Sequence, residues 1–268
     1  MSHRPVSYGP RPWQQTNWDW RAAANFMLGG TGAGLMITES FVQNQSPYPV
    51  ILALLLVAGG LGAVWLEIGR KLRAIHVFFN PQTSWMTRES IVAVVLFGFG
   101  ISSLVINASW IEYAAAVAAL AFIYCQARIL RAAKGIPAWR APEVVPLVLV
   151  MALAEGAGAA LMFQSGAIAL TLFALAVIAR AVAWSAYRGA LQQPGSRAAL
   201  EPAGKALMQL GTVAALALAL AAYYAPPAAP LAGLVAIAAG WRFKYVLVTR
   251  AAFNQGFSLS NVPVRGSP

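Results

Sequence analysis

Long apolar runs, each about the length of a membrane-spanning helix, occupy most of the chain from residue 22 to residue 249. A helix needs about 20 mostly apolar residues to cross the hydrocarbon core of a bilayer. Eight segments meet this requirement, at 22–42, 50–68, 90–106, 111–129, 144–163, 167–187, 206–224 and 231–249. The first segment is the least apolar. It is counted as a span because the alternation of basic turns with turns that lack Lys and Arg requires it. We therefore predict an all-α integral membrane protein with eight transmembrane helices, arranged as two four-helix bundles.

The turns between these segments alternate in charge. Those at 43–49, 107–110, 164–166 and 225–230 contain no Lys or Arg. All nineteen Lys and Arg residues fall in five other blocks: the leader, the three blocks associated with the second, fourth and sixth segments, and the end of the eighth segment with the tail. Because basic loops stay on the cytoplasmic side, we expect both termini in the cytoplasm.

This topology divides the chain into a polar leader at 1–21, a membrane domain at 22–249 and a tail at 250–268. The leader is rich in Pro and Trp and lacks the apolar core of a cleaved signal peptide. We therefore expect the first membrane helix to remain in the mature protein.

Composition excludes several classes of protein. Charged residues make up 10% of the chain and hydrophobic residues 59%, whereas a soluble domain carries about 25% charged residues. The net charge of +11 is dispersed among the membrane turns, which argues against nucleic-acid binding. Cys125, His3 and His76 are the only Cys and His residues, too few for a zinc site, an iron–sulfur cluster or a bis-histidine haem in this chain. We expect no metal site and no catalytic residue here.

A few polar residues within the apolar segments require an explanation, because charges at membrane depth are costly. Glu155 lies near the middle of the fifth segment and has no cation in its own segment. Glu67 lies near the cytoplasmic end of the second segment, and Asn25 near the inner end of the first. Gly30 and Gly34 form a GxxxG step that favours close helix packing. For Glu155, a proton path and a packing role remain equally open.

The turn after the second segment is the richest in polar chemistry. Cations, aromatic rings and hydroxyl groups are interleaved from residue 67 to residue 89. One interpretation is purely interfacial, with Trp85 in the aromatic belt and Arg88 as an anchor for lipid headgroups. Part of this run is also suited to capping the third helix.

The same turn resembles a motif of the membrane anchors of molybdopterin oxidoreductases, of the dimethyl sulfoxide reductase (DmsC) and polysulfide reductase (NrfD/PsrC) type. The matching pieces are Glu-Ile-Gly at 67–69, Arg-Ala at 73–74 and Ser-Trp-Met-Thr-Arg-Glu at 84–89. The two ends of the chain, at 18–34 and 244–266, are most similar to the anchors of phenylacetyl-CoA:acceptor oxidoreductases. The resemblance covers most of the chain.

The resemblance implies that the chain is a non-catalytic subunit of an oxidoreductase complex in the cytoplasmic membrane of a bacterium or archaeon. It would bind a quinone, either menaquinone or ubiquinone, next to an iron–sulfur subunit. That subunit would transfer electrons between the quinone and a molybdopterin catalytic subunit. Since the motif lies on the cation-rich side, we expect both partner subunits in the cytoplasm. Membrane lipid is a further expected partner, and nucleic acid is not.

The candidate quinone-binding residues are Asn25, Glu67, His76, Trp85 and Arg88. Glu67 occupies the position where these anchors often carry His or Asp, and it serves as a proton-transfer group, as does Glu155. His76 is a second proton carrier at this interface. Asn25 would hydrogen-bond a quinone carbonyl, Trp85 would stack on the ring, and Arg88 would orient Glu67 or hold the partner. The alternatives are a small multi-span transporter or permease, and an anchor with a purely structural role.

Overall fold

The protein is described by a computed structural model that covers residues 12–42, 46–68 and 71–256. Throughout these ranges the chain is helical apart from turns and one isolated β-bridge between Gln14 and Phe253. Within the described residues, six stretches are long and apolar enough to cross a membrane. They are α3 (Tyr48–Glu67), α4 (Trp85–Ser103), α5 (Ser109–Ala132), α8 (Ala167–Ala190), Pro194–Ala221, and Ala228–Arg250.

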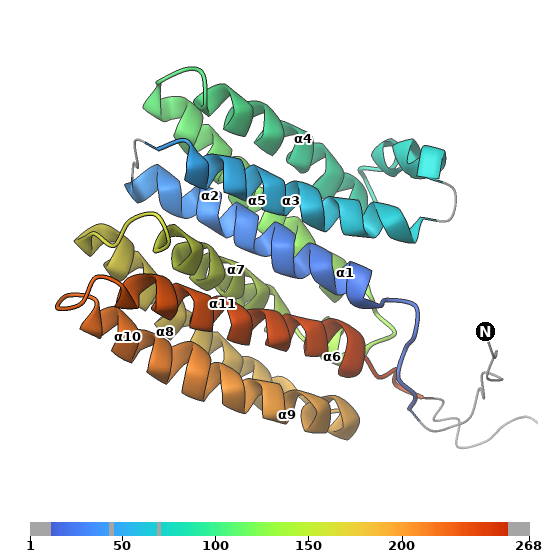
Figure 1. The fold of residues 1–268 in the computed structure, drawn as a ribbon. Helices are drawn as coiled ribbons and strands as arrows, with labels where there is room; N and C mark the ends of the chain where they lie inside the picture. Colours follow the sequence, from blue (N-terminus) through green and yellow to red (C-terminus); the bar gives the residue numbers. More distant parts are fainter. Residues whose placement is uncertain (1–11, 43–45, 69–70, 257–268) are drawn as a thin grey trace, which may run out of the picture.

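Two further helices lie among these six candidate spans. Residues 20–42 form one helix in three parts, α1 (Trp20–Ala24), the π-helical η1 (Asn25–Gly29) and α2 (Gly30–Val42). The shorter α7 (Val144–Ala160) packs against α2, α5, α8 and α11 (Ala228–Tyr245). Figure 1 shows all of these helices running along a common axis, with successive turns at alternate ends. The order of apolar segments predicted from the sequence is thus present as a helical bundle.

The two ends of the described chain meet at one end of this bundle (Figure 1). The backbone N–H of Gln15 donates to the Ala252 carbonyl at 2.9 Å, and the N–H of Asn254 donates to the Trp13 carbonyl at 3.0 Å. Residues 1–11 of the predicted leader, 257–268 of the predicted tail and Gly69 of the second-turn motif lie outside the described residues.

The turns on this side of the bundle contain more helix than predicted. The seventh long helix begins with α9 (Pro194–Met208), not at residue 206, and continues through the π-helical η3 (Gln209–Ala214) into α10 (Ala215–Ala221). Pro194 stands in the first turn, where its missing N–H costs nothing, and the Gln193 side chain accepts from the Ser196 N–H. Shorter helices, η2 (Lys71–Phe79, 3₁₀) and α6 (Pro137–Arg140), occupy two other turns.

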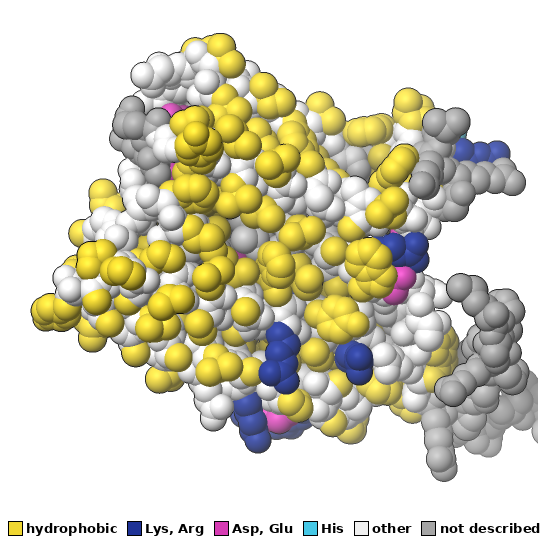
Figure 2. All heavy atoms as spheres, in the orientation of Figure 1, with side chains coloured by type: hydrophobic (Ala, Val, Ile, Leu, Met, Phe, Trp, Pro, Cys, Tyr) yellow, Lys and Arg dark blue, Asp and Glu magenta, His cyan; other side chains and the backbone are white. Residues whose placement is uncertain are grey.

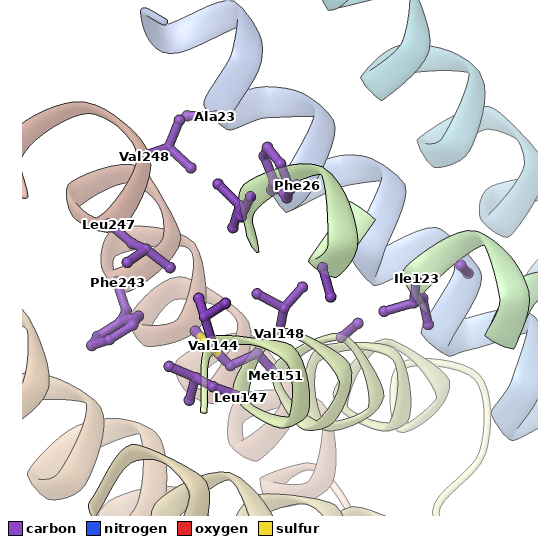
Figure 3. Close-up of a cluster of buried hydrophobic side chains, with 14 of the residues drawn as sticks. Ala23, Phe26, Ile123, Val144, Leu147, Val148, Met151, Phe243, Leu247 and Val248 are labelled. Carbon is purple, nitrogen blue, oxygen red and sulfur yellow. The ribbon is translucent and has the colours of Figure 1, made fainter. Parts of the chain in front are cut away.

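Small residues allow α2 and α7 to approach each other closely. A Cβ atom added to Gly34 would collide with the Ala152 carbonyl oxygen, and one added to Gly156 would collide with the Gly34 backbone. Gly30, the other member of the GxxxG step, instead leaves room for the Lys244 side chain. Next to this contact lies a buried cluster that includes Phe26, Val144, Leu147, Val148, Met151 and Phe243 (Figure 3).

The outer surface of the bundle is strongly apolar. Leu55, Val94, Val117, Leu175 and Val182 each expose 60% or more of their area. Hydrophobic side chains cover most of the face shown in Figure 2. An exposed apolar surface of this extent is what a protein in contact with lipid tails requires.

Two cations that the sequence analysis assigned to basic blocks are buried in the bundle. Arg180 lies in α8 and donates to the carbonyl oxygens of Ala236, at 3.0 Å, and Gly211. Lys244 lies near the end of α11 and is 1% exposed. Treating all nineteen basic residues as a topology signal was therefore wrong for these two, because both side chains are buried and donate to interior acceptors.

Candidate functional site

An open cleft at the end of the bundle where residues 12–20 and 250–256 lie is the candidate site. Its larger part, about 480 Å³, lies between α3, η2 and α4 and has mostly apolar walls. Its smaller part, about 200 Å³, extends toward α1. Both parts are bordered by Asn25, Val64, Ile68, Met86 and Glu89. We call the two together the cleft.

A buried polar wall separates the cleft from the interior of the bundle. The Asn25 amide donates to Glu89 Oε1 at 3.0 Å, and the Gln126 amide donates to the Asn25 backbone carbonyl at 2.9 Å. None of the three residues is more than 4% exposed. Asn25 Oδ1 and Gln126 Oε1 have no hydrogen-bond partner among the described residues. Buried acceptors of this kind usually find a partner, so the wall is able to receive a donor from a bound molecule.

The local backbone explains why Asn25 reaches this position. Asn25 begins the π-helical turn η1, and such turns are frequent at functional sites. Two glycines make room for its side chain: a Cβ on Gly29 would lie 3.2 Å from Asn25 Oδ1, and one on Gly60 would lie 3.1 Å from the same atom. The wall therefore depends on small residues in α3 and η1.

Glu67 borders the smaller part of the cleft at the end of α3 and is half-buried. Next to it, Arg21 donates to the Leu66 carbonyl at 3.3 Å and forms an ion pair with Asp19 at 2.8 Å. The hydrogen bond from the Arg21 side chain lowers the pKa of Asp19 below its usual value. An acid and an ion pair thus stand where the cleft approaches the polar end of the bundle.

The other three predicted residues do not line the cleft. His76 is exposed on η2, with Nδ1 3.0 Å from the Arg73 carbonyl oxygen. Arg88 lies over the Trp85 ring and donates to the carbonyl oxygens of Pro81 and Gln82, not to Glu67. The structure therefore brings Asn25 and Glu67 together at the cleft and leaves His76, Trp85 and Arg88 on its outer side.

Glu89 is a cleft residue that the sequence analysis did not select. Its position beside Arg88 at the start of the third apolar segment suggested a helix-capping role. In the structure Ser84 caps α4, with its hydroxyl oxygen accepting from the Thr87 N–H at 3.3 Å, and Glu89 points inward to Asn25. Glu89 directly precedes the predicted third span at 90–106, whereas α4 begins at Trp85 and so places it one helical turn inside the helix.

Glu155 belongs to a second group of buried polar side chains, which lies at the centre of the bundle. Its Oε2 atom lies 2.6 Å from Lys244 Nζ and accepts from the Thr31 hydroxyl at 2.8 Å. Trp241 donates to that hydroxyl at 2.9 Å. Glu155 therefore has hydrogen-bond partners, and one of them is a cation from another segment. Lys244 was missed as a site residue because its position near the end of its segment suggested a topology signal.

The cleft wall and this central group approach each other across Gly30. A Cβ on Gly30 would lie 2.7 Å from Lys244 Nζ and 3.6 Å from Gln126 Oε1. Lys244 also donates to the Phe26 carbonyl at 2.8 Å, one residue from Asn25. A run of buried polar groups therefore extends from Glu89 at the cleft to Glu155 at the centre, with Gly30 between its two halves.

The apolar helices and the cleft define the chain as a multi-pass membrane protein with an open cleft and buried ionisable groups. No family model matches it. Over 131 residues it is 28% identical to a subunit of the sulfite dehydrogenase of Allochromatium vinosum. This alignment covers 40% of the chain and 38% of that protein, so the chain spans about two fifths of the relative's length.

Proposed function

We propose that this chain is the membrane subunit of an oxidoreductase complex and exchanges electrons between an iron–sulfur partner subunit and the membrane quinone pool. The observation that carries the proposal is the cleft, whose larger part has mostly apolar walls and ends on the wall formed by Asn25 and Glu89. The similarity to a sulfite dehydrogenase component supports membership of a redox complex.

A quinone fits the chemistry of these walls. Its isoprenoid tail requires an apolar groove open to lipid, and residues such as Leu61, Phe78 and Phe97 supply one. Its ring oxygens require polar partners at the closed end. Asn25 Oδ1, buried and without a partner among the described residues, is an acceptor for a hydroxyl of the reduced ring. Ligand sites commonly combine apolar walls with a few such polar groups.

The chain's own acids supply the proton chemistry. A quinone takes up two protons for every two electrons it accepts. Glu89 is placed to hold a proton at the closed end of the cleft, and Glu67 to exchange one at its polar end. Glu155 and Lys244 form an interior proton store that reaches the wall across Gly30. Electrons arrive from a metal-bearing partner, with a molybdopterin subunit beyond it, on the side of the bundle where the two ends of the described residues meet.

The full membrane arrangement extends the six candidate spans to eight. We propose that the helix at 20–42 and α7 also cross the bilayer, since both run alongside the others (Figure 1). The four turns without Lys or Arg then lie on the outer side. The basic turns and both termini lie in the cytoplasm of a bacterial or archaeal cell.

Quinone extraction from the purified chain tests the proposal. We expect the wild-type protein to retain quinone, detected by chromatography of a solvent extract. Ser90→Phe should lower the occupancy because residue 90 lines the cleft, and Val95→Phe on the same helix should not, since residue 95 is exposed outside it. Equal quinone content in the two variants, or none in the wild type, would overturn the quinone assignment and favour a transporter or a structural anchor.

A further inference from the structure

A compact group of cations and aromatic rings lies on the outer side of the cleft. The guanidinium carbons of Arg88 and Arg128 are each 4.2 Å from the centroid of the Trp85 ring. The Tyr124 ring meets Trp85 edge-on, with centroids 5.8 Å apart. Because each guanidinium carbon is 4.2 Å from the same ring centroid, the two carbons lie no more than about twice that distance apart. Arg88 belongs to α4 and Arg128 to α5.

Both cations are fixed in place by hydrogen bonds to neutral groups. Arg88 donates through Nε and Nη2 to the Pro81 and Gln82 carbonyl oxygens, at 2.8 and 2.7 Å. Arg128 donates through Nη1 to the Tyr124 hydroxyl at 2.6 Å. Each guanidinium has five N–H donors, so both retain donors for a further acceptor.

No acid of the described chain balances this pair of charges. The ion pairs found there are Arg21–Asp19, Arg188–Glu201 and Lys244–Glu155. Glu89, the neighbour of Arg88 in sequence, is buried and bonded to Asn25. Two like charges this close repel each other, and more strongly near a membrane than in bulk water. The arrangement therefore has a net positive charge that an external anion would neutralise.

The position of the group shows where that anion comes from. Trp85 is the first residue of α4, and Arg128 lies in the last two turns of α5. Both helices are candidate membrane spans, so the group lies at the membrane surface, in the zone where Trp and Tyr rings gather and headgroup phosphates lie.

We propose that Arg88 and Arg128, stacked on Trp85, bind the phosphate of an anionic phospholipid between α4 and α5. Guanidinium groups match the geometry of phosphate oxygens and form charge-assisted hydrogen bonds with them. The Trp85 ring spaces the two cations, and their bonds to neutral oxygens orient them before the lipid arrives. Basic pockets between transmembrane helices bind lipid headgroups in this way. The site is separate from the cleft and does not depend on quinone binding.

Native mass spectrometry of the full chain in detergent tests this site with three added probes: phosphatidylglycerol, phosphatidylcholine and inorganic phosphate. We expect the wild type to retain phosphatidylglycerol in preference to phosphatidylcholine. Arg128→Gln should lower phosphatidylglycerol occupancy by about tenfold, as expected for the loss of one charge-assisted hydrogen bond. Arg131→Gln is the matched control, because Arg131 is exposed on the same helix and lies outside the group.

The outcomes separate the possible sources of the anion. Equal losses in Arg128→Gln and Arg131→Gln would show a diffuse surface charge effect and overturn the proposal. Competition by millimolar inorganic phosphate would identify a free-anion site, and equal retention of phosphatidylcholine would remove the requirement for an anionic lipid; either result would overturn the assignment to an anionic phospholipid. The circular dichroism spectrum of each variant shows whether it is folded, and Arg88→Gln provides a second test of the same group.

Discussion

The side chains of Lys244 and Glu155 form an ion pair at 2.6 Å in which neither is more than 1% exposed. Lys244 comes from α11 and Glu155 from α7, and Thr31 of α2 donates to the same carboxylate. Gly240 is required beside the pair, because a Cβ there would collide with Glu155 Oε1. One buried acid therefore links three helices that are distant in the sequence.

Removing one member of this pair should destabilise the bundle strongly. Replacing Lys244 by Met leaves the Glu155 carboxyl in the interior without its cation, at a cost of about 3–5 kcal/mol. The double variant Lys244→Met/Glu155→Gln should recover part of this loss, because no buried charge remains unpaired. Thermal unfolding of the detergent-solubilised single and double variants measures the coupling.

Arg242→Met provides the control for that cycle, since Arg242 is on the same helix but exposed. It should unfold at nearly the wild-type temperature. If Lys244→Met behaved in the same way as Arg242→Met, the ion pair would make no net contribution to stability.

The contact between α2 and α7 should not tolerate any side chain at Gly34. Gly34→Ala places a methyl group against the Ala152 carbonyl oxygen, and neither backbone is able to move without separating the helices. We expect loss of several kcal/mol and poor recovery of folded protein. Gly62→Ala on α3 is the matched control, because nothing lies within 4 Å of its Cβ. The ratio of monodisperse to aggregated protein in size-exclusion chromatography compares the two.

The sequence predicted the helices well where apolar residues alone determine them. The runs that became α3 and α8 are nearly free of charge, so their hydropathy was sufficient. The start of α9 was missed because a stretch containing Arg197 and Glu201 looks like a polar turn. In the structure it is helical, and the buried Ser196 donates to the Ala251 carbonyl at 2.6 Å.

The candidate site could be predicted only in part, because a single sequence does not show which sides of the helices contact one another. Asn25 and Glu67 were found because polar groups in apolar segments are conspicuous. Glu89 and Lys244 stood near segment ends, where an interfacial role explains a charge equally well. Their inward orientation depends on contacts with Asn25 and Glu155, which lie far away in the sequence.

The two acids of the cleft should both be needed for quinone-linked turnover. Glu67→Gln and Glu89→Gln each remove a proton donor but keep the size of the side chain, so the complex should assemble normally. We expect Glu67→Gln to abolish electron transfer to quinone, and Glu89→Gln to slow it by about a hundredfold, as is usual for loss of an acid–base group. Steady-state quinone reduction by membranes containing the complex measures both. Undiminished turnover in Glu67→Gln would refute its role.

The side of the membrane on which the termini lie is open to a direct test. The hydrogen bonds from Gln15 to Ala252 and from Asn254 to Trp13 hold the two ends of the described residues together, so we expect a reporter fused at one terminus to report the side of both. A green fluorescent protein fused after Pro268 should fluoresce, because it folds in the cytoplasm and not after export through the general secretory pathway. Alkaline phosphatase inserted in the turn at 164–166 should be active, because it requires the periplasm. The opposite pair of results would place the basic turns, and with them the proposed partner subunits, outside the cytoplasm.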